Sequence, residues 1–143
     1  MTAINAEHVW EHLTEEQAFA AAKNCFEFLK PGGYVRCAVP DGLHPSELYI
    51  EWVRPGGIGP GSDDHHALYD FESLSRVFQS AGFEVELLEY HDREGEFHAT
   101  SWDPELGMVE RSIRFDPQDR DVTFLYTSLI VDAVRPGKQK AAR

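Results

Sequence analysis

Two stretches of the chain repeat apolar residues every three or four positions, between a polar start and a glycine stop. The first follows Thr14, which begins a capping box with the glutamine three residues later. The second follows Asp70, a residue type favoured at helix N-caps, and stops at Gly82. The apolar positions are Phe19, Ala22, Phe26 and Leu29, then Leu74, Val77, Phe78 and Ala81. Such spacing marks the buried face of a helix, and it predicts helices over residues 15–30 and 71–81.

Other stretches have the patterns of β-strands. Residues 34–39 are apolar except for Arg36 and too few for a helix, which is typical of an interior parallel strand. Alternation of apolar and polar residues starts at Phe83, as in a half-buried strand. A short apolar start and a long β-like run near the end complete the set. The predicted strands cover residues 3–8, 34–39, 83–90 and 123–134.

The connections differ in length and character. Residues 40–66 are rich in proline and glycine, and a loop this long inside a domain is usually functional or partly mobile. Within it, residues 46–53 are apolar enough for a short helix. Residues 96–116 indicate a small β excursion around Phe97 and Trp102. The order of elements predicts an α/β fold.

Charge and composition exclude several classes of protein. Asp and Glu total 25 against 13 Lys and Arg, a net charge of −12 that repels phosphate backbones, so we expect no nucleic-acid partner. No apolar run reaches membrane-spanning length, and the N-terminus lacks the pattern of a signal peptide. We therefore expect no membrane association and a cytoplasmic location.

One domain is expected over residues 1–136, followed by a flexible basic tail, residues 137–143. The two cysteines are too few for a disulfide framework. Cys25 falls in a helical pattern and Cys37 in a strand pattern, so both are expected to be small core residues.

The segment from Cys25 to Asp41 carries a family resemblance. It contains a helix end, a Lys-Pro-Gly-Gly turn, a buried strand and a Pro-Asp exit. It resembles the helix and fifth strand of class I S-adenosylmethionine (SAM) dependent methyltransferases. From Ala6 to Pro136 the chain is similar to one bacterial group within that class. The other matching segments are residues 6–13, 69–74, 81–83, 111–116 and 126–133.

The resemblance implies a fold, a cofactor and a set of site residues. The fold is a partial Rossmann-like sheet that keeps the family's strand order 4-5-7-6, with the last strand antiparallel and helices on the faces of the sheet. The cofactor is SAM, and ligands of such sheets lie outside the carboxyl ends of the strands. The residues implied for catalysis are His8, Glu11 and His12, one of them as general base. Those implied on the cofactor side are Glu7, Pro40 and Asp41. Contacts on the substrate side are assigned to His65, His66 and Tyr69, with a solvated loop as the alternative for the two histidines.

The chain also departs from the family. No strand followed by a Gly-x-Gly turn opens it, so the family's first three strands are expected to be absent. The glycine-rich residues 56–61 contain a proline and lie late in the chain, which favours an adaptable loop over a cofactor cradle. We therefore expect the isolated chain to bind SAM weakly or not at all. Two functions remain open: a methyltransferase-like protein with a small-molecule acceptor, or a non-catalytic dimeric scaffold. The homodimer would form through the edge of the N-terminal strand, which pairs with the first strand in the family.

His8 to His12 also matches His-x-x-Glu-His, a zinc-protease pattern. Zinc binding there requires both histidines on one face of a helix. The capping box at Thr14 starts a helix only after the motif, which predicts a strand-to-helix loop instead. We therefore assign no metal site from the sequence.

Overall fold

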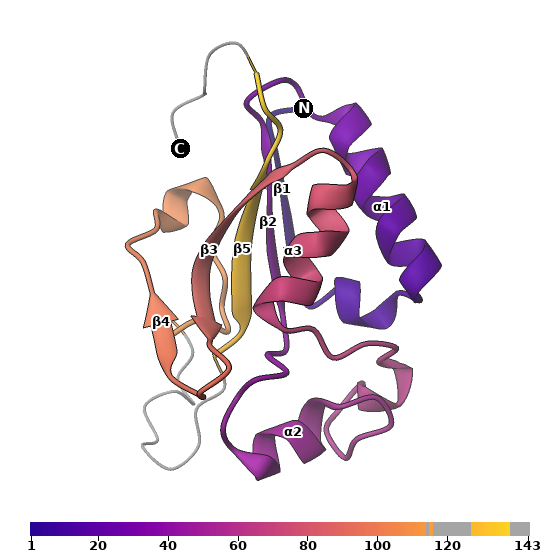
Figure 1. Ribbon diagram of the computed structural model, residues 1–143, viewed down its shortest axis with the longest axis vertical. Coiled ribbons are helices and arrows are strands. Elements are labelled where there is room, and N and C mark those ends of the chain that lie inside the picture. The colour runs from indigo at the N-terminus through magenta and orange to yellow at the C-terminus, as the bar shows by residue number, and fades with distance from the viewer. Residues whose placement is uncertain (114, 116–126, 138–143) are drawn as a thin grey trace.

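The computed structural model describes residues 1–113, 115 and 127–137. A five-stranded sheet in the order β1-β2-β5-β3-β4 forms its centre (Figure 1). The strands are β1 (Ala3–Glu7), β2 (Tyr34–Val39), β3 (Glu84–His91), β4 (Phe97–Ala99) and β5 (Leu129–Val134). β1 is parallel to β2, β5 is antiparallel to β2 and to β3, and β4 is antiparallel to β3. The predicted order, with the last strand inserted between the second and third, is confirmed.

Element boundaries agree with the sequence patterns except near the end of the chain. β5 begins only at Leu129, and residues 127 and 128 have no strand structure. The start of the predicted strand, residues 123–126, lies outside the described residues, as does the basic tail from 138 onward. The predicted β excursion contains one short strand, β4, and a 3₁₀ helix, η3 (Pro104–Leu106).

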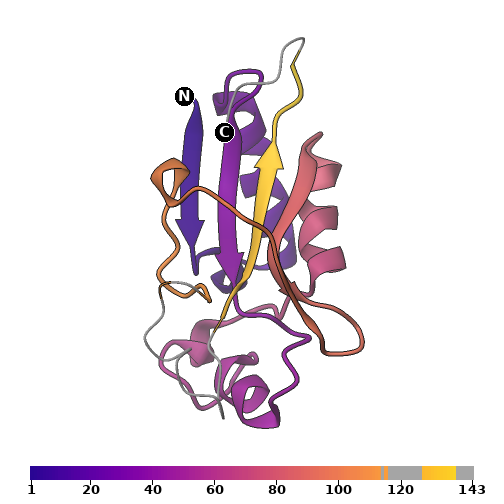
Figure 2. The ribbon, with the colours of Figure 1, turned by 90° about the vertical axis from the view of Figure 1, so that its left-hand side faces the viewer.

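Two helices cover one face of the sheet, as Figures 1 and 2 show: α1 (Glu15–Phe28) and α3 (Phe71–Ser80). The predicted capping box at Thr14 is present, with Thr14 Oγ1 accepting from the Gln17 N–H at 3.3 Å. Asp70 is the N-cap of α3 as predicted, and the structure adds a capping box there, with Asp70 Oδ1 accepting from the Ser73 N–H at 2.8 Å. Fully buried Ala18 and Ala22 of α1 and Phe78 of α3 belong to the main core together with residues of the strands. Both helices thus lie on one face instead of being shared between the two faces.

The opposite face is covered by an irregular segment, residues 100–113, which crosses in front of the sheet in Figure 2. Trp102 and Val109 of this segment pack on Ala38, Leu88 and Ile130 of the strands. The segment therefore closes the second half of the core without a long helix.

A buried ion pair lies on this second face. The guanidinium of Arg36 on β2 forms a bidentate salt bridge with the Asp132 carboxylate on β5, with nitrogen–oxygen distances of 2.8 and 2.9 Å. Another guanidinium nitrogen donates to the carbonyl oxygens of Asp103 and Gly107 at 2.7 and 2.9 Å. Arg36, the single polar residue predicted within its strand, thus connects two strands to the crossing segment.

The two cysteines are free, and burial raises the pKa of both thiols above the ordinary value. Cys37 is fully buried in β2, while Cys25 on α1 is half-buried. Both contribute to the main core, as predicted.

The long proline- and glycine-rich stretch folds beyond the carboxyl ends of β1 and β2, at the bottom of Figure 1. It contains the predicted short helix, α2 (Glu47–Val53), whose N-cap Ser46 accepts from the Tyr49 N–H at 3.2 Å, and a 3₁₀ helix, η2 (Ser62–Asp64). Across the described part of the chain, none of the helices has the length and apolar character needed to cross a membrane.

Candidate functional site

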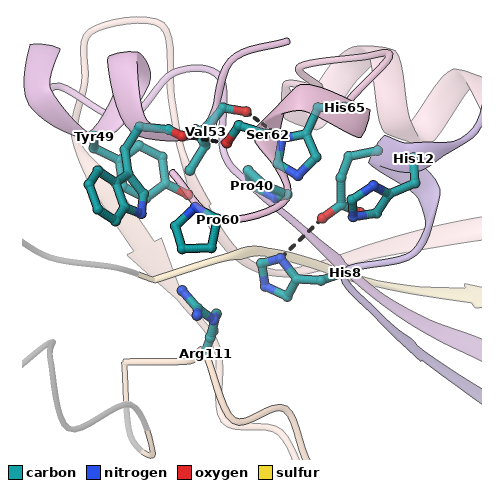
Figure 3. Close-up of a pocket in the computed structure, with 11 residues that line it drawn as sticks. His8, His12, Pro40, Tyr49, Val53, Pro60, Ser62, His65 and Arg111 are labelled. Carbon is teal, nitrogen blue, oxygen red and sulfur yellow. Dashed lines mark hydrogen bonds and ion pairs between the residues drawn. The ribbon is translucent and has the colours of Figure 1, made fainter. Parts of the chain in front are cut away.

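A cavity of about 170 Å³ lies at the carboxyl ends of β1 and β2, between the sheet and the long stretch that carries α2 and η2 (Figure 3). It is lined by His8, Glu11, His12, Pro40, Tyr49, Trp52, Val53, Pro60, Ser62, His65 and Arg111. The three residues implied for catalysis therefore share one cavity with one cofactor-side and one substrate-side residue.

His8 lines the cavity and has an unusual backbone conformation. Its N–H donates to the Ala38 carbonyl at 2.8 Å, which continues the β1–β2 pairing by one residue. The chain then turns sharply, because His8 has φ of +56°, the only positive φ outside glycine among the described residues. This left-handed region is uncommon for a side chain, although histidine is enriched there, and such positions cluster at functional sites.

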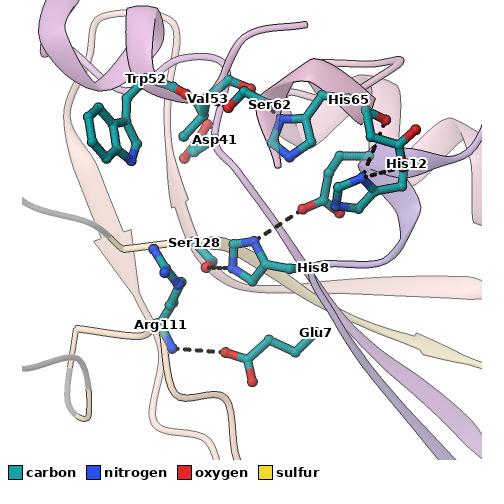
Figure 4. Close-up of polar contacts among 12 residues, drawn as sticks. Glu7, His8, His12, Asp41, Trp52, Val53, Ser62, His65, Arg111 and Ser128 are labelled. Atoms are coloured by element: carbon teal, nitrogen blue, oxygen red, sulfur yellow. Dashed lines mark hydrogen bonds and ion pairs between the residues drawn. The ribbon is translucent and has the colours of Figure 1, made fainter. Parts of the chain in front are cut away.

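Both ring nitrogens of His8 have partners, as Figure 4 shows. Nδ1 lies 3.1 Å from Glu11 Oε2, and Nε2 lies 2.9 Å from Ser128 Oγ. A carboxylate only accepts hydrogen bonds, so Nδ1 carries the proton in the neutral ring and Nε2 accepts from the Ser128 hydroxyl. Ser128 is only 1% exposed and is no accessible nucleophile, whereas the His8 side chain is 26% exposed. This arrangement orients His8 as a proton acceptor at Nε2.

Glu11 is buried, with 1% of its surface exposed. It lies in η1 (Trp10–His12), a 3₁₀ helix between β1 and α1, which confirms that the His-x-x-Glu-His motif is not on a regular α-helix. Trp10 fixes this turn, since its ring packs against Phe78 at 5.1 Å and its Nε1–H donates to the Ala18 carbonyl at 3.3 Å. Glu11 Oε1 has no hydrogen-bond partner among the described residues.

His12 and His65 meet across the cavity, with ring centroids 4.7 Å apart. His65 follows η2, which begins after Gly61, a glycine in the left-handed region at φ of +81°. The His12 Nδ1 lies 3.2 Å from the Asp64 carboxylate, and the His65 Nδ1 lies 2.6 Å from the Val53 carbonyl oxygen. The folded loop therefore places His65 beside the His-x-x-Glu-His motif.

The residues implied on the cofactor side are not equivalent. Pro40 lines the cavity, and Glu7 lies beside it, with Oε1 accepting from the Arg111 N–H at 3.0 Å. Asp41 is fully buried and absent from the lining. Its Oδ2 accepts from the backbone N–H of His91 at 2.8 Å and lies 3.0 Å from the ring Nδ1. The Asp41 carboxylate thus connects the ends of two strands.

His66 and Tyr69 lie at a different cavity, of about 310 Å³, between α1 and α3. It is lined by Glu15, Phe19, His66, Ala67, Leu68, Tyr69, Ser73, Arg76 and Val77. Burial raises the pKa of Tyr69 to about 12, so its phenol keeps its proton at neutral pH. The residues assigned to the substrate side are therefore divided between two cavities.

Several residues that line the cavity or contact His8 were not predicted from the sequence. Arg111 and Ser128 both lie in segments that match the family, and Ser128 N–H donates to the Arg111 carbonyl at 2.8 Å. Tyr49 and Trp52 sit in the short helix that was predicted without a role in the site. Burial raises the pKa of Tyr49, whose hydroxyl oxygen accepts from the Asp41 N–H at 3.0 Å. Only the family segments offered a signal for any of these residues.

Comparison with solved structures identifies the class of fold. A SAM dependent methyltransferase from Archaeoglobus fulgidus superposes with a TM-score of 0.50 at 16% identity, over 94% of this chain and 58% of that one. A chain from the complex between the Haloferax volcanii Trm112 methyltransferase activator and a protein assigned as a methyltransferase gives 0.52 at 16% identity, over 97% and 55%. No protein-family model and no curated protein sequence matches the chain. The fold is methyltransferase-like, and the chain spans little more than half the length of these solved structures.

Proposed function

We propose that this chain forms the acceptor side of a SAM-dependent methyl-transfer site. The observation that carries the proposal is the cavity that His8 and Glu11 line at the carboxyl ends of β1 and β2. Open α/β sheets bind their ligands at this edge. The methyltransferase-like fold of the chain supports the assignment of SAM as the methyl donor.

The cavity fits a small acceptor and not the whole cofactor. Its volume of about 170 Å³ falls below the roughly 300–1,000 Å³ that pockets for larger ligands occupy. In the proposed role, SAM supplies the methyl group and is held by a part of the site that these 143 residues do not provide. The Nε2 of His8 takes a proton from the methyl acceptor, which replaces Ser128 as the hydrogen-bond donor to this nitrogen. Glu11 then stabilises the imidazolium that forms.

Titration of the isolated chain with small acceptors tests this proposal. We expect alcohols, phenols or amines, followed by NMR, to shift the imidazole resonances of His8, because the acceptor hydrogen-bonds to Nε2. The imidazole of His98, which is exposed on β4, provides the control and should not shift. If no member of these classes shifts His8, the acceptor role is contradicted.

Calorimetry with SAM and S-adenosylhomocysteine forms the second arm of the same experiment. The chain alone should bind both with a dissociation constant weaker than about 1 mM, because the cavity holds only the acceptor. Micromolar binding would instead mean that the chain holds the cofactor by itself.

The sheet edge favours a second function, as a dimeric scaffold. Among the described strands β1 pairs only with β2, and the exposed Ala3 and Asn5 lie along its free edge. The Thr2 carbonyl accepts from the Tyr34 N–H and the His8 N–H donates to the Ala38 carbonyl, so even-numbered residues direct their backbone groups to β2. The N–H groups of the odd-numbered residues point away from β2, and those of Ala3 and Asn5 have no backbone partner among the described residues, so they can pair with a second copy.

Ala3→Pro is expected to convert a homodimer into a monomer. Proline removes an outward N–H and is tolerated at the first residue of an edge strand, so the fold should persist. Size-exclusion chromatography with light scattering would measure twice the mass of one chain for the wild type and a single mass for the variant. Ala3→Val keeps the N–H and should remain dimeric. A wild-type chain that is monomeric at high micromolar concentration would refute the scaffold.

A further inference from the structure

We propose that Glu11, His12 and His65 form a binding site for a divalent transition-metal ion, of which zinc is the best match. Each residue offers one ligand atom, and the three atoms lie within 4.8 Å of one another at the wall of the cavity. The site does not depend on methyl transfer, because it follows from the donor atoms alone.

Both imidazoles form hydrogen bonds through Nδ1, and neither Nε2 has a hydrogen-bond partner in the described part of the chain. The Val53 carbonyl can only accept, so the His65 Nδ1, 2.6 Å away, carries the proton and Nε2 keeps its lone pair. The His12 Nδ1 faces two acceptors of Asp64, its carbonyl oxygen at 3.3 Å and its carboxylate at 3.2 Å, which leaves the His12 Nε2 free in the same way. Metal-binding histidines almost always have such a carbonyl or carboxylate partner at the other nitrogen.

The third ligand is an unsatisfied buried carboxylate oxygen. Oε2 of Glu11 is taken by the His8 Nδ1 at 3.1 Å, while Oε1 has no partner in the described part of the chain. Glu11 is only 1% exposed, and burial of a carboxylate oxygen without a partner is unfavourable. A cation at this position gives Oε1 the partner that it lacks.

The donor set selects the ion. Two imidazoles and one carboxylate suit zinc and related ions, whereas magnesium and calcium prefer oxygen ligands alone. Tetrahedral zinc places its ligand atoms about 3.4 Å apart, so the side chains must close slightly around the ion. The His12 side chain is 31% exposed, so a small shift of its ring does not require the buried core to move. Three protein ligands leave a fourth position open to the cavity for water or a small ligand.

The site uses only part of the His-x-x-Glu-His motif. His8 is hydrogen-bonded to Glu11 and Ser128, and its place is taken by His65, which follows η2 (Figure 4). A second group, Asp92, Glu96 and His98, also lies within 4.8 Å, but Glu96 and His98 are exposed and the His98 Nε2 already contacts Asp92 at 2.7 Å. This second group supplies the control.

Calorimetric titration of the chelator-treated full chain with zinc tests the proposal, with cobalt absorption as a second probe of imidazole ligation. We expect one ion per chain and no competition from millimolar magnesium. His65→Ala and Glu11→Gln should each weaken zinc binding by at least about 100-fold. Loss of a residue that only supports a ligand weakens metal binding by up to about 100-fold, and loss of a ligand should cost at least as much. Asp64→Asn removes only the carboxylate that orients His12 and should weaken zinc binding about 10-fold. His98→Ala should leave binding unchanged.

Three results would overturn the site: no zinc binding by the wild type, binding that His65→Ala leaves intact, or binding that only His98→Ala abolishes. Circular dichroism of each variant serves as the control for folding. His65→Ala decides the matter if Glu11→Gln does not fold, because His65 lies on a partly exposed loop.

Discussion

Asp132→Asn is expected to lower the free energy of unfolding by about 3–5 kcal/mol. The substitution leaves the Arg36 guanidinium, 2% exposed, without its counter-charge, and the new amide nitrogen faces a nitrogen donor. Breaking a buried ion pair on one side is strongly destabilising because a charge stays buried and uncompensated. Urea unfolding followed by circular dichroism measures the change.

Two further variants isolate the cause. Glu72→Gln makes the same chemical change in the exposed pair with Arg93 at 2.9 Å and should change stability by no more than about 1 kcal/mol. The double substitution Arg36→Met with Asp132→Leu removes both charges and should recover most of the stability. Equal changes in the free energy of unfolding for Asp132→Asn and Glu72→Gln would show that the buried pair contributes no more to stability than an exposed one. Hydrogen exchange in residues 100–113 should rise with Asp132→Asn, because Arg36 also binds that segment.

Asp41→Ala is expected to lower the free energy of unfolding by about 3 kcal/mol, through loss of charged hydrogen bonds. The Asp41 carboxylate accepts from the Leu43 N–H at 3.1 Å and the His91 N–H at 2.8 Å, and all three residues are at least partly buried. Those N–H groups would lose their partner inside the protein. Thermal or urea unfolding gives the difference, and binding of small acceptors by the folded fraction should be unchanged.

Asp63→Ala provides the matched comparison, since Asp63 is an exposed aspartate and its loss should stay within about 0.5 kcal/mol. A stable Asp41→Ala variant that no longer bound an acceptor would contradict the structural role. It would instead support the cofactor-side role that the family resemblance implies for Asp41.

Local patterns in the sequence determined most of the secondary structure. Thr14 and Asp70 begin their helices as predicted, because a capping box needs only residues within one helical turn. The buried run of β2 and the alternation of β3 likewise depend on the burial of single side chains. Insertion of β5 between β2 and β3 was different, since it came from the family resemblance and is now seen in the pairing.

Only the tertiary structure decided which polar residues meet. His8 and Ser128 are 120 positions apart, and no periodicity links them. Asp41 and Pro40 are neighbours in the chain, yet one is buried in a network and the other lines the cavity. His65 and His66 are adjacent as well, and each lines a different cavity.

The physical reason is the range of the interactions. Caps and apolar periodicity act within a few residues, so they can be identified along the chain. The position of a loop such as residues 54–66 depends on packing against distant elements, and contacts such as the hydrogen bond from the His66 N–H to the Glu11 carbonyl at 2.7 Å exist only after folding. The sequence therefore determined the helices, the main strands and the presence of the His-x-x-Glu-His motif, while the fold determined the cavity and the three side chains proposed to bind a metal.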